Sequence, residues 1–131
     1  TNDIYILYQI AELYDKQKDK AKSEEVYKKL ISKDKNYILG YVQLGRLYYE
    51  QKDYRSAKKY IEMAFEKTFL EEYSYGSYLD LHYYRGMIAV KEGRKMEAIM
   101  AYIDMKSTYT YTKEENEKKL ALYKAIKKLE E

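Results

Sequence analysis

The most constraining feature of this sequence is a pattern of small and aromatic residues that recurs along the chain. The pattern is clearest in residues 41–65, where two short amphipathic segments are joined by a tight turn. Apolar or small side chains lie three or four residues apart within each segment, which is the spacing of one face of a helix. They are Tyr41, Leu44, Gly45 and Tyr48 in the first segment, and Ala57, Ile61 and Ala64 in the second. The same arrangement occurs once before this stretch and once after it, so the sequence predicts three helix hairpins.

Equivalent positions define the length of the repeated unit. Ala11, Gly45 and Gly86 correspond to one another, and their spacing is 34 residues and then 41. The units cover residues 4–37, 38–71 and 79–112, with a seven-residue insertion at 72–78 and a final helix within 113–131 that we expect to cap the stack. Since the chain has no Pro and five Gly, few residues break helices, and the sequence predicts an all-α protein of about seven helices.

Polar residues mark where the helices should begin and end. Thr112 and Glu115 have the spacing of a capping box. The other signals are N-caps and turns. They are Asn2 or Asp3, the turns at 16–19 and 33–36, Asn36, Asp53, Ser77, and the turn at 92–95 that contains Gly93.

The insertion interrupts the even spacing. Seven residues make about two helical turns, so residues 70–76 can lengthen the preceding helix without rotating its face. We therefore predict that the second helix of the middle unit runs to about Tyr73 and projects beyond its neighbours; the alternative is a loop.

Helix-turn-helix units of this length and pattern resemble the tetratricopeptide repeat. The resemblance covers about 102 of the 131 residues and is strongest in the middle unit. The third unit departs at Arg85 and Ala89, and the Pro that often closes a unit is missing from all three. The first unit fits through Leu7, Ile10, Ala11, Tyr14, Ser23, Tyr27 and Leu30. The resemblance implies a single domain over residues 1–131, folded as a right-handed α-α superhelix of three hairpins.

The resemblance also implies a function, because the first helices of such repeats line a concave groove that receives a peptide or a helix. The positions that would line it are Tyr5, Tyr8, Glu12, Leu39, Val42, Arg46, Tyr49, Asp80, Tyr83, Met87 and Val90. Our hypothesis is that the groove binds an apolar or aromatic segment of a protein partner. Arg46 would pair with an acidic group, and Glu12 or Asp80 with basic ones. The alternative is that the chain's own extra segments, or another copy, fill the groove.

No motif indicates a catalytic, metal-binding or nucleic-acid-binding site. The net charge of +3 is spread along the chain, which argues against a nucleic-acid partner. The single histidine, His82, falls at a packing position, and there is no Cys, so we expect no metal site and no cofactor. No nucleotide-binding or hydrolase motif is present, and the sequence predicts no enzyme. Its apolar runs, such as 98–103, are too short to span a membrane.

Together these features predict a bacterial adaptor or assembly factor that acts as a protein-interaction scaffold. The alternative is a structural subunit that forms a homo-oligomer. The chain begins at Thr1 and reads as an excised piece. The location is therefore open: cytoplasmic or, if a signal has been removed, periplasmic.

Overall fold

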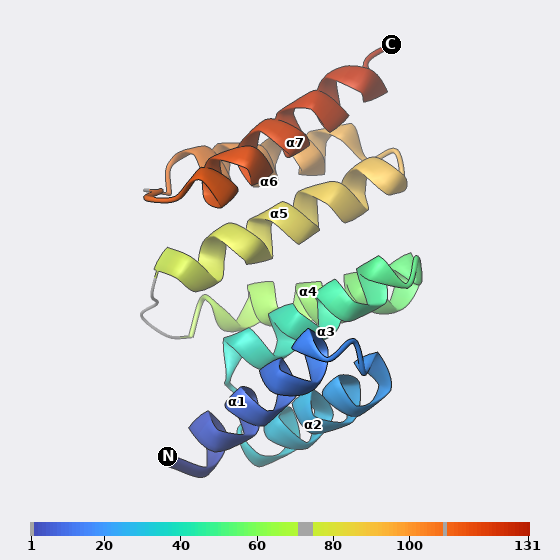
Figure 1. Cartoon of the computed structure of the whole chain (residues 1–131). Helices are drawn as coiled ribbons and strands as arrows, with labels where there is room; N and C mark the ends of the chain where they lie inside the picture. Colours follow the sequence, from blue (N-terminus) through green and yellow to red (C-terminus); the bar gives the residue numbers. More distant parts are fainter. Residues whose placement is uncertain (1, 71–74, 109) are drawn as a thin grey trace. The chain divides into compact units, whose positions relative to one another are not determined.

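Seven helices and no strands make up the described part of the chain (Figure 1). The computed structural model describes residues 2–70, 75–108 and 110–131, with only the backbone for residues 2 and 75–78. The helices are α1 Asn2–Lys16, α2 Lys20–Lys33, α3 Ile38–Glu50, α4 Tyr54–Lys67, α5 Tyr75–Lys91, α6 Lys95–Lys106 and α7 Lys113–Leu129. Their contacts divide the chain into two compact units, Thr1–Thr68 and Phe69–Glu131. The all-α prediction is confirmed.

Unit 1 consists of two helix hairpins. Helix α1 packs on α2, α2 packs on α3, and α3 packs on α4. Small residues allow the close approach: a side chain at Gly45 would place its Cβ 2.5 Å from Ile61 of α4. The Ser23 hydroxyl, which is buried, donates a hydrogen bond of 3.0 Å to the Ala11 carbonyl and so joins α2 to α1. The core between the hairpins is formed by Ala11, Tyr27, Leu44 and Leu47.

Unit 2 consists of one hairpin, α5 and α6, with α7 packed against both helices. Gly86 of α5 leaves room for Leu122 of α7, because a Cβ added at position 86 would lie 2.6 Å from the nearest Leu122 methyl. The cap of α7 is the predicted one, because Thr112 and Glu115 form a capping box. The core of this unit is formed by Leu79, Ala89, Ala98, Met105, Leu122 and Ile126.

The turn inside each hairpin has the same backbone feature. Lys18, Lys52 and Gly93 have φ angles of 65°, 64° and 71°, in the left-handed region. They are 34 and 41 residues apart, which is the spacing obtained from the small residues. Asp19 and Asp53 then cap the following helices by accepting the backbone N–H groups of Lys22 and Ser56. The backbone therefore supports the register of the three hairpins independently of their side chains.

The predicted extension of the fourth helix is wrong. Helix α4 ends at Lys67, where Thr68 tightens the last turn. The Thr68 N–H donates to the Phe65 carbonyl at 3.1 Å, and its hydroxyl donates to the same oxygen at 2.6 Å. These i to i+3 contacts satisfy the end of the helix locally. Residue 73, to which the helix was predicted to run, lies outside the described residues.

Three predicted caps are also wrong. Helix α1 already includes Asn2 and Asp3, so neither residue precedes it. Helix α5 begins at Tyr75, so Ser77 lies inside the helix rather than before it. Tyr37, not Asn36, is the N-cap of α3, and no side chain caps this helix. Asp34 accepts the Asn36 backbone N–H at 3.1 Å, so the polar residues at this point stabilise the turn and not the helix.

Candidate protein-interaction site

The first helices of unit 1 carry most of the predicted groove residues, and these residues differ in accessibility. Tyr5 is 63% exposed, whereas Tyr8 is half-buried between Tyr27 and Tyr37, at ring centroid distances of 5.8 and 6.0 Å. The Gln43 amide donates a hydrogen bond of 3.4 Å to the Tyr8 hydroxyl. Burial raises the pKa of Tyr8 to about 12. Tyr8 therefore serves packing between helices.

Arg46 of α3 joins this helix to α1 through its guanidinium group. It donates to Asp15 of α1 at 2.6 Å, to Glu50 at 3.1 Å and to Gln43 at 2.7 Å. Lys20 of α2 also donates to Glu50, at 2.6 Å. Partial burial opposes the ionisation of Glu50, but Lys20 and Arg46 outweigh it and lower the pKa of that carboxyl. The acidic group that we expected from a partner is thus supplied by the chain itself, and Arg46 holds α1 and α3 together.

The remaining predicted residues of unit 1 fall into two groups. Val42 is fully buried, so it has no surface to offer a ligand. Glu12, Leu39 and Tyr49 are half-buried, and the Tyr49 ring lies 5.5 Å from that of Tyr54. Accessible surface on this face comes chiefly from Tyr5, with contributions from Glu12 and Leu39.

In unit 2, the predicted residues of α5 contact α7. Asp80 accepts a hydrogen bond of 2.6 Å from the Lys118 ammonium, which lies 5.8 Å from the centroid of the Tyr83 ring. Tyr83, Met87 and Val90 pack against the core that includes Leu122. Lys118 of α7 follows Tyr83 of α5 by 35 positions, and Gln43 of α3 follows Tyr8 of α1 by the same number, so α7 follows α5 in the sequence as α3 follows α1. Here a segment of the chain itself occupies predicted groove positions, which is the alternative that the sequence left open.

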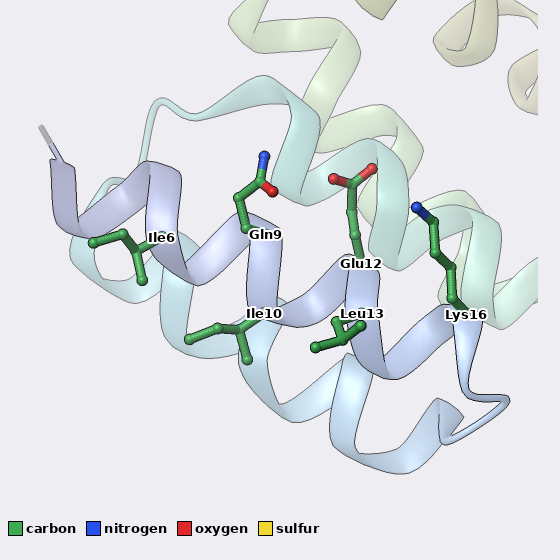
Figure 2. A pocket seen from close by; sticks show the side chains of 6 residues that line it. All are labelled: Ile6, Gln9, Ile10, Glu12, Leu13 and Lys16. Atoms are coloured by element: carbon green, nitrogen blue, oxygen red, sulfur yellow. The ribbon is translucent and has the colours of Figure 1, made fainter.

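A second face of α1 escaped the sequence prediction. Ile6, Ile10 and Leu13 form a row at i, i+4 and i+7, and each is between 39% and 56% exposed. Figure 2 shows this row beside a second row of polar side chains, Gln9, Glu12 and Lys16. The six residues line a depression of about 320 Å³. The sequence counts Ile10 among the residues that fit the repeat pattern, and the apolar spacing of Ile6, Ile10 and Leu13 is the signal that could have identified the row.

His82 lies within unit 2 and is almost fully buried. Burial lowers its pKa to about 4, although Asp104, 3.9 Å away, favours the protonated form. Arg85 lies 3.3 Å from His82 Nδ1 and donates a hydrogen bond of 3.0 Å to Asp104. Within residues 2–70, 75–108 and 110–131, no group of three or more His, Asp and Glu side chains converges as a metal site.

The fold is that of a helical-hairpin repeat protein, and comparison with known families identifies the repeat. The family model described as "Tetratricopeptide repeat" matches residues 5–37 and 40–67, which are the two hairpins of unit 1. The chain therefore contains two tetratricopeptide repeats. Such repeats are non-catalytic and generally mediate protein–protein interaction. No curated protein shows significant similarity to the chain.

The third hairpin lies outside the matched residues, so its assignment to the same repeat remains a prediction. None of the described helices has the length and apolar character needed to cross a bilayer.

Proposed function

We propose that the chain is a protein-interaction scaffold, without catalytic activity, that binds a peptide or helix segment on the first-helix face of unit 1. The observation that supports this proposal is the exposure of Tyr5, together with the partial exposure of Glu12 and Leu39, on two helices that Arg46 joins. An exposed aromatic ring on a rigid surface provides contact area at low entropic cost. The ligand is an apolar or aromatic segment, with a basic group near Glu12.

A displayed library of random peptides tests this proposal without knowledge of the natural partner. We expect selection on the wild-type chain to enrich peptides that carry aromatic residues and a Lys or Arg. Tyr5→Ala combined with Glu12→Gln should weaken their binding at least about tenfold, since an interface depends on a few anchors. Tyr111→Ala is the matched control, because Tyr111 is also exposed but lies in unit 2. Equal binding to both variants would contradict the proposal.

One observation favours the alternative of a self-associating subunit. Met96, Met100 and Ile103 form an exposed row on α6, each between 54% and 70% exposed. The equivalent positions are Ala21, Glu25 and Lys28 in α2, and Arg55, Lys59 and Glu62 in α4. An apolar row where the other hairpins are largely polar is typical of an interface. Light scattering of the wild type and of Met100→Glu over a range of concentrations tests this: a monomer in both samples excludes it.

A further inference from the structure

Helices α1 and α3 are equivalent, but only one of them has its outer row covered. The row formed by Ile6, Ile10 and Leu13 in α1 corresponds, 34 residues on, to Gly40, Leu44 and Leu47 in α3. All three α3 residues are buried, and α2 covers them. Tyr27 of α2 belongs to the same core as Leu44 and Leu47, and Leu30 and Ile31 lie against Gly40. The molecule therefore contains an example of how a helix covers this row.

The size of the side chains specifies how a helix on α1 must differ from α2. A Cβ at Gly40 would lie 2.6 Å from Ile31 and 3.1 Å from Leu30, so α2 approaches α3 where there is no side chain. In α1 this position is Ile6. A helix that packs there in the same way must carry a small residue in the place of Ile31, since an extra side chain cannot fit in so close a contact.

The charges give a second requirement. Lys20, at the start of α2, donates to Glu50 at the end of α3 at 2.6 Å. The residue of α1 that corresponds to Glu50 is Lys16, which is exposed and lies in the polar row beside the depression (Figure 2). Helix α1 therefore carries a positive charge at the position where α3 carries a negative one. A helix in the α2 position on α1 is therefore complementary when an acidic residue takes the place of Lys20.

We propose that the outer row of α1 binds one amphipathic helix of a partner protein, packed as α2 packs on α3. This helix carries two large apolar side chains three residues apart. The first contacts Ile10 and Leu13, as Tyr27 packs with Leu44 and Leu47, and the second lies against Ile6, as Leu30 lies against Gly40. A small residue follows the second of them and lies over Ile6. Ten positions before the second large apolar residue, the helix carries an acidic residue, and this residue pairs with Lys16. The inference uses Ile6, Ile10, Leu13 and Lys16, whereas the peptide-binding function proposed above uses Tyr5 and Glu12, so substitutions can test the two separately.

Peptides based on α2 test the inference directly. The parent peptide has the sequence of residues 19–34, and a lactam bridge between Glu25 and Lys29, both exposed in α2, keeps it helical. The complementary peptide carries Lys20→Glu and Ile31→Ala. Fluorescence anisotropy with a labelled peptide and the full chain should show the complementary peptide binding about tenfold more tightly than the parent.

Two variants of the chain assign the binding to the row. Ile10→Glu should abolish binding of the complementary peptide, and unchanged circular dichroism shows that the chain remains folded. Lys16→Glu should reverse the charge preference, so that a peptide with Ile31→Ala alone binds better than the complementary peptide. Met100→Glu, on the exposed row of α6, is the control and should bind as the wild type does.

Three results would overturn the inference. The first is no binding of the complementary peptide at concentrations up to about 1 mM. The second is binding that Ile10→Glu leaves intact, or a charge preference that Lys16→Glu leaves unchanged. The third is self-association of the wild-type chain that Ile10→Glu abolishes, because the row would then pair with a second copy.

Discussion

Helices α1 and α3 have the same register in the repeat, yet the outer row of one is exposed and that of the other is buried. Ile10 and Leu44 occupy equivalent positions and are both large aliphatic residues. Ile10 is 39% exposed, whereas Leu44 is fully buried beneath α2. The residue type is nearly the same, so the difference arises from the neighbouring helix. In a repeat protein, the place of a residue in the stack decides its burial as much as its chemistry does.

Helix α5 carries a third version of the row. Its equivalent positions are Leu81, Arg85 and Ile88, and all three are buried. Arg85 takes the place of Leu44, and Asp104 accepts its hydrogen bond at 3.0 Å. A buried guanidinium needs such partners, since an unpaired charge away from water is costly. The same register thus accommodates an exposed apolar row, a buried apolar row and a buried row with a charge.

The largest expected effect comes from truncating the two equivalent aliphatic residues. Leu44→Ala should reduce the free energy of unfolding of unit 1 by about 2–5 kcal/mol, because it leaves a cavity in the core. Ile10→Ala should cost less than about 1 kcal/mol, as for a partly exposed position. Urea unfolding followed by circular dichroism measures both. Similar losses at the two sites would remove the distinction between the rows.

A pH-dependent effect is expected from His82, which lies next to Arg85 of the charged row of unit 2. The pKa of His82 is lowered from 6.5 to about 4 by burial, so protons bind the unfolded chain more readily than the folded one. Stability is therefore lost as the pH falls from about 6.5 towards 4, by about 2 kcal/mol between pH 7 and pH 5. His82→Gln removes this contribution. Denaturant unfolding of wild type and variant at both pH values should show a smaller loss for the variant, and equal losses would contradict the assignment.

A side chain added to the buried row of α3 should be tolerated only if the facing side chains of α2 move or are made smaller. Gly40→Ala gains helix propensity, but its Cβ would lie 2.6 Å from Ile31. We expect a net loss of about 1 kcal/mol in the free energy of unfolding, because overpacking outweighs propensity. Ile31→Ala should relieve the clash, which a double-mutant cycle measures as a coupling between the two sites. The equivalent variant in α1, Ile6→Ala, should show no such coupling to Ile31.

The smallest expected effect concerns the charges at the ends of the two helices. Glu50 pairs with Lys20 and Arg46 but is more than a third exposed, so Glu50→Gln should cost at most about 1 kcal/mol. Added salt should reduce this cost, since ions screen exposed pairs. Lys16→Gln, at the equivalent exposed position of α1, should leave the thermal midpoint unchanged. A loss on Lys16→Gln as large as that on Glu50→Gln would contradict the comparison.

The sequence was sufficient to predict what depends on local periodicity. The turn at Gly93, the Asp53 cap and the Thr112–Glu115 capping box are set by residues close in sequence, and the structure confirms them. The end of α4 was not predictable in this way. Residues beyond Lys67 could continue a helix, and the helix ends where Thr68 bonds to the Phe65 carbonyl instead.

The interaction surfaces were less predictable because they depend on contacts between helices. Arg46 has the chemistry of a ligand-binding cation, but Asp15, 31 residues away, accepts its hydrogen bond. Val42 is fully buried although its position in the repeat suggested a groove. The exposed row on α1 has the composition of a core face. Only the position of α2, which packs against a different face of α1, shows that this row is uncovered.

Thiol labelling tests the central comparison most directly, because the chain has no cysteine of its own. Ile10→Cys and Leu44→Cys place one thiol at each of the two equivalent positions. We predict that the thiol at position 10 reacts with an aromatic disulfide nearly as fast as a free thiol. The thiol at position 44 should react at least about a hundredfold more slowly, because reaction requires local opening of the α2–α3 contact. Equal rates at the two positions would contradict the account, since both rows would then be covered or both exposed.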